Sequence, residues 1–145
     1  MLTPKAKNFI DQLVFANLER LGVPPSPVCD DATFLRRVSL DIAGRLATVA
    51  ETSAFLANKS PDKRDRLVDS LLSSPDYADY FANKWTALLK NTRDGNKDVA
   101  SNFAFHSWVR DGLLANKPYD QMVRELLAAT GTIAGNPAVA WYKRV

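Results

Sequence analysis

Apolar residues recur at spacings of three and four along most of this chain, and this periodicity constrains the fold more than any other feature. Within residues 5–21 five of them fall on one side of a helix: Ile10, Leu13, Val14, Leu18 and Leu21. Gly22 follows where a helix can end in a left-handed residue, and the proline-rich residues 24–27 cannot continue it. The pattern therefore predicts a helix that ends at Gly22.

Helix start and stop signals divide the rest of the chain. Thr48 and Glu51 have the spacing of a capping box, and Ser60-Pro61 and Ser74-Pro75 each place a hydroxyl before a proline that suits the first helical position. We expect further helices from Asp30 or Asp31 to Gly44, from Thr48 to near Asn58, from Ser60-Pro61 to Leu72, from Ser74-Pro75 to Leu88, from about Ser101 to Ala115, and from near Pro118 to Gly131.

The fold class follows from these helices. No stretch shows the alternation of a strand bounded by turns, so we expect an all-α fold: a single irregular bundle of about seven short to medium helices, with residues 1–145 as one helical domain. The predicted core faces are Phe34, Leu35, Val38 and Ile42; Leu67, Val68, Leu71 and Leu72; Tyr77, Phe81, Trp85 and Leu88; Phe105, Trp108, Val109 and Leu113; and Tyr119, Met122, Val123, Leu126 and Leu127.

Composition restricts the class of partner. Hydrophobic residues make up 46% of the chain and charged residues 24%, and the formal net charge is only +3. Basic residues near Arg36 and Arg64 alternate with acidic ones such as Asp41 and Asp65, which cancels the positive field that binding to phosphates requires. No apolar run approaches the ~20 residues of a membrane-spanning helix. We therefore expect no nucleic-acid partner and no membrane insertion by this chain.

Few residues could carry chemistry. His106 is the single histidine and Cys29 the single cysteine, so neither a Ser-His-Asp triad nor a zinc site of Cys and His ligands can be assembled. Asp30 with Asp31, and Asp76 with Asp79, lie in predicted first helical turns, where the helix dipole accounts for acidic residues. We assign no catalytic, cofactor-binding or metal-ligating residue, and whether the chain is an enzyme stays open, with the balance against it.

The three tryptophans leave two interpretations open. Trp85 and Trp108 fall on apolar helical stripes, which favours core packing, but with Trp141 they could also form a platform for a ligand. A polar stretch at 93–98 with turn-forming residues predicts a surface loop between Thr92 and Ala100. A cleft that held an exposed Trp85 or Trp108 next to ionisable groups would favour the ligand-binding interpretation, and fully buried tryptophans would weigh against it.

Several runs resemble one family. They are residues 34–44 (Phe-Leu-Arg-Arg-Val-Ser-Leu-Asp-Ile-Ala-Gly), residues 73–77 (Ser-Ser-Pro-Asp-Tyr) with Trp85, Trp108-Val109-Arg110, residues 116–127, Asn136-Pro137-Ala138 and Trp141-Tyr142. Together they resemble the cytochrome-associated helical domain of unknown function that is typical of planctomycetes. One departure is visible, because Gly44-Arg45-Leu46-Ala47 stands where members usually have Gly-Leu-Pro-Pro, which puts the rigid turn before the third helix in doubt.

The resemblance implies a context for the chain. Such domains belong to large exported proteins that also carry cytochrome-c-like domains, so the chain is expected to be a fragment of a larger multidomain protein at the cell surface or in the periplasm. Its partners would be neighbouring domains of the same polypeptide. Haem c would be bound by those other domains, and no cofactor is expected in residues 1–145.

We expect one of two functions for the chain. The first is a non-catalytic helical module of an extracytoplasmic, cytochrome-c-linked multidomain protein, which packs against neighbouring domains. The alternative is a carbohydrate-binding or hydrolytic enzyme domain with a site near the Thr92–Ala100 loop, built from Trp, Arg and Asp side chains.

Overall fold

The computed structural model describes residues 5–92 and 99–143. These residues form helices and no strand, which confirms the all-α prediction. The chain divides into two compact units, Met1–Asp31 and Ala32–Val145, and each is described by itself. The prediction of one domain over residues 1–145 stays a prediction. The central residues of the predicted loop, 93–98, lie outside the described residues.

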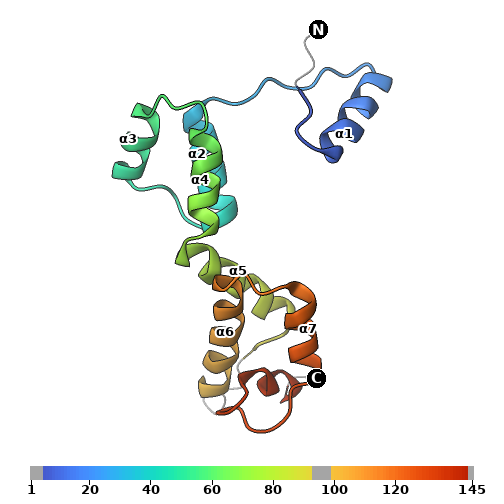
Figure 1. The fold of residues 1–145 in the computed structure, drawn as a ribbon, viewed down its shortest axis with the longest axis vertical. Coiled ribbons are helices and arrows are strands. Elements are labelled where there is room, and N and C mark those ends of the chain that lie inside the picture. The colour runs from blue at the N-terminus through green and yellow to red at the C-terminus, as the bar shows by residue number, and fades with distance from the viewer. Residues whose placement is uncertain (1–4, 93–98, 144–145) are drawn as a thin grey trace. The chain divides into compact units, whose positions relative to one another are not determined.

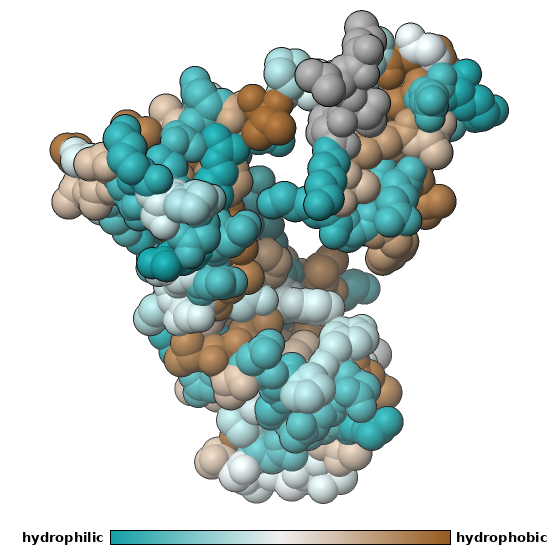
Figure 2. Space-filling view, turned by 45° about the horizontal axis from the view of Figure 1, so that its top comes forward, coloured by the Kyte–Doolittle hydropathy of each residue, from teal (hydrophilic) through white to brown (hydrophobic). Residues whose placement is uncertain are grey.

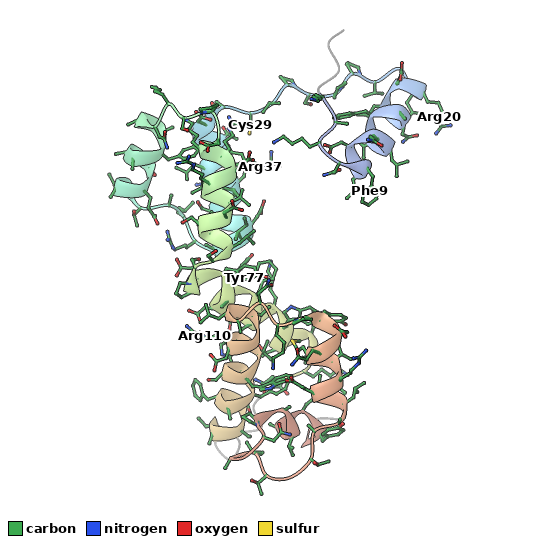
Figure 3. All side chains as sticks on the ribbon, in the orientation of Figure 1. Phe9, Arg20, Cys29, Arg37, Tyr77 and Arg110 are labelled. Carbon is green, nitrogen blue, oxygen red and sulfur yellow. The ribbon has the colours of Figure 1, made fainter. Side chains whose placement is uncertain are left out.

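The first unit holds helix α1, Phe9–Arg20. Asn8 begins it, because the Asn8 side chain accepts a hydrogen bond from the Asp11 backbone N–H at 3.0 Å. The helix ends before Gly22, whose φ is +67°, as predicted. Figure 3 shows Phe9 and Arg20 near its two ends. None of its residues is buried, so the predicted inward face of α1 has no core within this unit.

The second unit begins with α2 (Asp31–Val38), which continues into a π-helical turn, η1 (Ser39–Ala43). Then follow α3 (Val49–Ala57), α4 (Lys63–Leu72) and α5 (Pro75–Leu88). Both α4 and α5 contact η1, so the π turn lies where the first helices of this unit meet. The chain continues with α6 (Val99–Leu114), α7 (Tyr119–Leu127) and a 3-10 helix, η2 (Pro137–Lys143), which the sequence did not predict (Figure 1).

The main core of this unit lies between α5, α6, α7 and η2. Helix α5 packs along α6, and η2 packs on α6 and α7. The fully or nearly buried side chains of this core are Ala82, Phe105, Val109, Leu126, Ala129, Ala138 and Ala140. Trp85, Trp108 and Trp141 pack against it and are partly buried. Most of these side chains are alanines, and their small size lets the helix backbones approach one another closely.

Most predicted helix starts are confirmed. The Glu51 backbone N–H donates to Thr48 Oγ1 at 3.2 Å, and the Thr48 N–H donates to Glu51 Oε2 at 2.6 Å, so the capping box forms despite the missing prolines. Ser74 caps α5 by accepting from the Tyr77 N–H. The start at Ser60-Pro61 was wrong: α4 begins at Lys63, because the Ser60 hydroxyl donates to the Asp62 carboxylate instead of capping.

Several residues predicted to face the core are exposed. In α5 the buried residues are Ala78, Ala82 and Thr86, one turn apart. The predicted aromatic stripe beside them is only half-buried, although Trp85 packs against the core as predicted. The reason is the close approach of α6, which small side chains permit and rings would block. Leu88, at the end of α5, is consequently 73% exposed. The prediction that Leu72, Tyr119 and Leu127 face the core was also wrong, because these three side chains are exposed.

Gly44 fixes the turn after η1. Its φ is +68°, a left-handed conformation that glycine adopts without strain. The ring of Tyr80 on α5 lies so close that a Cβ at position 44 would stand 2.3 Å from Tyr80 Cδ2. Position 44 therefore requires glycine for two reasons: the left-handed backbone conformation, and the lack of room for a Cβ beside the Tyr80 ring.

Candidate functional site

The single histidine lies on the wall of a groove between α5 and α6. His106 Nε2 is 3.0 Å from Oδ1 of Asn83, one helix away, and the histidine is half-buried. Cys29 is half-buried in the segment before α2 and belongs to the first unit, whereas His106 belongs to the second.

Both aspartates of the 76/79 pair are held by arginines from other elements. Arg45 Nε donates to Asp76 Oδ2 at 2.6 Å, and Arg45 also donates two hydrogen bonds to Glu51, at 2.9 and 2.8 Å. Arg110 on α6 donates to Asp79. These contacts join the start of α3, the start of α5 and the middle of α6. Each carboxylate therefore has a structural role that accounts for its position.

The ion pairs shift the pKa values of their members. The hydrogen bonds from Arg45 are the largest cause that lowers the pKa of the Glu51 carboxyl, from 4.5 to about 2, and the Thr48 backbone N–H adds to the effect. Hydrogen bonds to Glu51 and Asp76 raise the pKa of Arg45, and the bond to Asp79 raises the pKa of Arg110. All of these shifts favour the charged forms, which suits fixed ion pairs and not groups that exchange protons near neutral pH.

The groove that contains His106 has a polar wall, and we call it the asparagine groove. It is open to solvent and has a volume of about 510 Å³. Its lining residues are Asn83, Thr86, Asn91, Asn102, Phe103 and His106. They come from α5, from the segment that follows it and from α6, and the groove therefore adjoins the predicted Thr92–Ala100 site. The described residues that line the groove include no Trp, Arg or Asp, and residues 93–98 of the predicted site lie outside the described residues.

Hydrogen bonds hold the walls of the asparagine groove in place. Asn91 Nδ2 donates to the backbone oxygen of Asn102 at 3.1 Å, and Asn102 Nδ2 donates to the backbone oxygen of Asn91 at 3.2 Å. The Thr86 hydroxyl donates to the backbone oxygen of Ala82 at 2.7 Å. Reciprocal bonds of this kind fix the rotamers of both asparagines, so the groove is formed before any ligand arrives.

A second groove runs beside Trp108. It encloses about 420 Å³, and its other walls are mostly small residues of α6 and the turn after it. Two ionisable residues line it, Asp111 and Lys117. Lys117 Nζ is 2.5 Å from Glu125 Oε2 and 5.6 Å from the centre of the Trp108 ring, and this ammonium lowers the pKa of Glu125. The lysine is thus committed to structural contacts.

Helix α1 presents the third feature that could function in binding. Phe9 is 70% exposed and Leu13 68%, and Ile10 and Val14 are exposed beside them. On a helix these four residues share one side, which we call the α1 apolar face. The space-filling view shows apolar surface interleaved with polar side chains on this unit (Figure 2).

Residues 5–92 and 99–143 contain no cluster of three His, Cys, Asp or Glu side chains that could hold a metal ion. None of the helices in these ranges combines the length and the apolar character that crossing a bilayer requires.

Sequence reasoning missed the asparagine groove for a definite reason. Asn83, Asn91 and Asn102 belong to different parts of the chain, and only the pairing of α5 with α6 brings them together. The sequence contained one signal. Phe103 lies off the apolar stripe that Phe105 and Val109 define, which indicates an aromatic side chain on the surface of the helix. A single off-stripe ring does not by itself locate a groove.

Comparison with known proteins gives one match. The family described as PSCyt2, protein of unknown function (DUF1549), matches residues 9–142. No curated protein matches the chain, and no solved structure matches it.

Proposed function

The chain belongs to the PSCyt2 family of proteins of unknown function (DUF1549), and from this premise we propose that it is a non-catalytic helical module that packs against neighbouring domains of a larger polypeptide. The observation that carries the proposal is the α1 apolar face. Helix α1 is the one helix described in the first unit, and none of its residues is buried.

An exposed face of this kind is costly to leave in water. Burying an apolar side chain such as Leu or Phe contributes about 1.5–3 kcal/mol each, so four adjacent residues could stabilise a docked helix by several kcal/mol before the cost of ordering. An isolated helix of 12 residues is marginal in water even when its composition favours helix. Both considerations support a partner that covers Phe9, Ile10, Leu13 and Val14.

The ion pairs support a structural role for the second unit. Glu51, Asp76 and Asp79 each accept hydrogen bonds from an arginine of another element, and these bonds hold helices together. The hydrogen bonds from Arg45 lower the pKa of the Glu51 carboxyl, so this carboxylate stays charged as a member of a fixed ion pair. We therefore propose a structural module in preference to an enzyme.

The proposal also includes a cellular context, which rests on sequence resemblance. The larger polypeptide is extracytoplasmic, at the cell surface or in the periplasm, and carries cytochrome-c-like domains. Haem c is bound by those domains, and this chain contributes no cofactor. A native gene product with the 16.1 kDa mass of these 145 residues would refute this part of the proposal.

Trypsin cleavage after Arg20 tests the docking of α1 in the intact polypeptide. If a neighbouring domain covers the α1 apolar face, cleavage there is slow, and Leu13→Asp accelerates it by placing a charge in the contact. Gln12→Asp is the matched control, because it adds the same charge at the preceding position, which lies outside the α1 apolar face. Equal cleavage rates for the two variants would contradict the proposal.

A second candidate function has one observation in its favour. The asparagine groove adjoins the Thr92–Ala100 segment, where the alternative of a carbohydrate-binding or hydrolytic domain placed its site. The hydrolytic version lacks support, because the six described residues that line the groove include no carboxylate to serve as acid or base. Binding of a carbohydrate without hydrolysis would depend on the hydrogen-bonding and apolar groups that line the groove.

A further inference from the structure

The described residues that line the asparagine groove offer hydrogen-bonding groups without the formal charge of Asp, Glu, Lys or Arg. These residues supply three carboxamides, one hydroxyl, one imidazole and one phenyl ring. A carboxamide and a hydroxyl each contain both a donor and an acceptor. A ligand that complements this wall must therefore offer donors and acceptors together and no strong charge of its own.

Two of the carboxamides have groups left for a ligand. Asn91 uses its Nδ2 on the Asn102 backbone, and no described residue donates to its Oδ1. Asn83 has the opposite arrangement, because its Oδ1 meets His106 Nε2 and its Nδ2 has no acceptor among the described residues. The groove thus holds one fixed acceptor and one fixed donor, and binding to fixed groups loses little side-chain entropy.

Phe103 adds an apolar element to this polar groove. Its side chain is 66% exposed although it belongs to α6, whose inward positions are taken by Phe105 and Val109. The face of an aromatic ring carries partial negative charge, and it attracts the weakly positive C–H bonds of a flat ligand that stacks on it. No packing requirement of the described core accounts for a phenyl ring at this position.

We propose that the asparagine groove binds a neutral sugar unit of an oligosaccharide. A pyranose ring has hydroxyl groups around its edge, which both donate and accept, and a face of C–H bonds, which stacks on a ring. An anionic ligand would find no Arg or Lys among the described residues that line the groove. A purely apolar ligand would leave the Asn91 oxygen and the Asn83 nitrogen buried without partners, which costs about 1–3 kcal/mol for each group.

The size of the groove is consistent with this ligand. Its volume of about 510 Å³ falls within the range of about 300–1,000 Å³ that is typical of small-molecule sites. The inference goes beyond the proposed docking function, since the groove lies in the second unit and the α1 apolar face in the first. Either can fail without the other.

An NMR titration of the 145-residue chain tests the proposal. The probes are neutral tetrasaccharides (cellotetraose, maltotetraose, mannotetraose and chitotetraose), with tetragalacturonate as the anionic comparison and tetra-alanine as the peptide comparison. We expect at least one neutral sugar to give saturable shifts in the side-chain amide signals of Asn83, Asn91 and Asn102. The other two probes are expected to leave these signals unchanged.

Two variants connect the shifts to the ring. Phe103→Ala removes the stacking surface and weakens binding about five- to tenfold. Leu88→Ala is the control, because Leu88 is as exposed on neighbouring α5 but does not line the groove, and its affinity stays unchanged. The proposal is overturned if no neutral probe saturates by about 10 mM, which would place any affinity weaker than ordinary ligand binding. Tighter binding of tetragalacturonate or tetra-alanine, or full affinity in Phe103→Ala, would overturn it as well.

Discussion

Replacing Gly44 with alanine separates two effects at the turn after η1. The first is conformational, because an L-residue at φ +68° is strained by about 1–2 kcal/mol. The second is steric, because the new Cβ would stand 2.3 Å from Cδ2, 2.6 Å from Cγ and 2.8 Å from Cε2 of Tyr80. A ring cannot yield as the end of a flexible chain does, so α5 or the turn must move.

The combined cost is large for an exposed glycine. Forcing extra atoms into a packed contact costs about 1–3 kcal/mol, so Gly44→Ala should destabilise the fold by about 2–5 kcal/mol in total. Gly131→Ala is the matched control: its φ is +98°, yet nothing lies within 4 Å of the added Cβ, so only the backbone effect remains. The predicted difference between the two variants is at least about 1 kcal/mol.

Urea unfolding followed by circular dichroism measures both variants. A Tyr80→Ala background provides the decisive comparison, because removing the ring should leave Gly44→Ala with its backbone cost alone. A steric clash with Tyr80 is refuted if Gly44→Ala and Gly131→Ala lower the free energy of unfolding by the same amount. It is also refuted if the Tyr80→Ala background leaves the loss caused by Gly44→Ala unchanged.

Three further predictions concern acid stability and the core. Because the pKa of Glu51 is lowered from 4.5 to about 2, its ion pair with Arg45 stabilises the fold fully above pH 4.5 and is lost as the pH falls toward 2. Exposed pairs are screened by solvent, so acid titration of unfolding should show a loss of about 1 kcal/mol or less that Glu51→Gln abolishes; an equally steep acid loss in this variant would contradict the assignment. Phe105→Ala empties the centre of the main core, and chemical denaturation should show a loss of about 3–5 kcal/mol. Leu88→Ala should change stability by less than about 0.5 kcal/mol, and a larger loss would show that this leucine is covered.

The sequence predicted those parts of the fold that depend on neighbouring residues. Thr48 and Glu51 satisfy each other's backbone groups three residues apart, Ser74 caps its own helix, and Gly44 ends the one before it. Each signal acts within one helical turn, so it survives whatever the rest of the chain does. The all-α class and most helix boundaries follow from such signals.

The contacts between helices were harder to predict. Periodicity placed the aromatic stripe of α5 at the centre of the core, whereas Ala78 and Ala82 are fully buried and the stripe is half-buried, because the choice between adjacent stripes depends on the partner helix. Arg45 shows the same limit, since its bond to Asp76 crosses 31 residues. The asparagine groove could not be predicted for the same reason, because only the pairing of α5 with α6 brings its lining residues together.

Hydrogen exchange of α1 tests the account most directly. Amide exchange of residues 9–20 should be measured by mass spectrometry in the 145-residue chain and in the intact polypeptide that contains it. A covered α1 apolar face predicts exchange at least about tenfold slower in the intact polypeptide, since each 1.4 kcal/mol of docking energy contributes a factor of about ten. Equal exchange rates in the two proteins would contradict the proposal that α1 packs against a neighbouring domain.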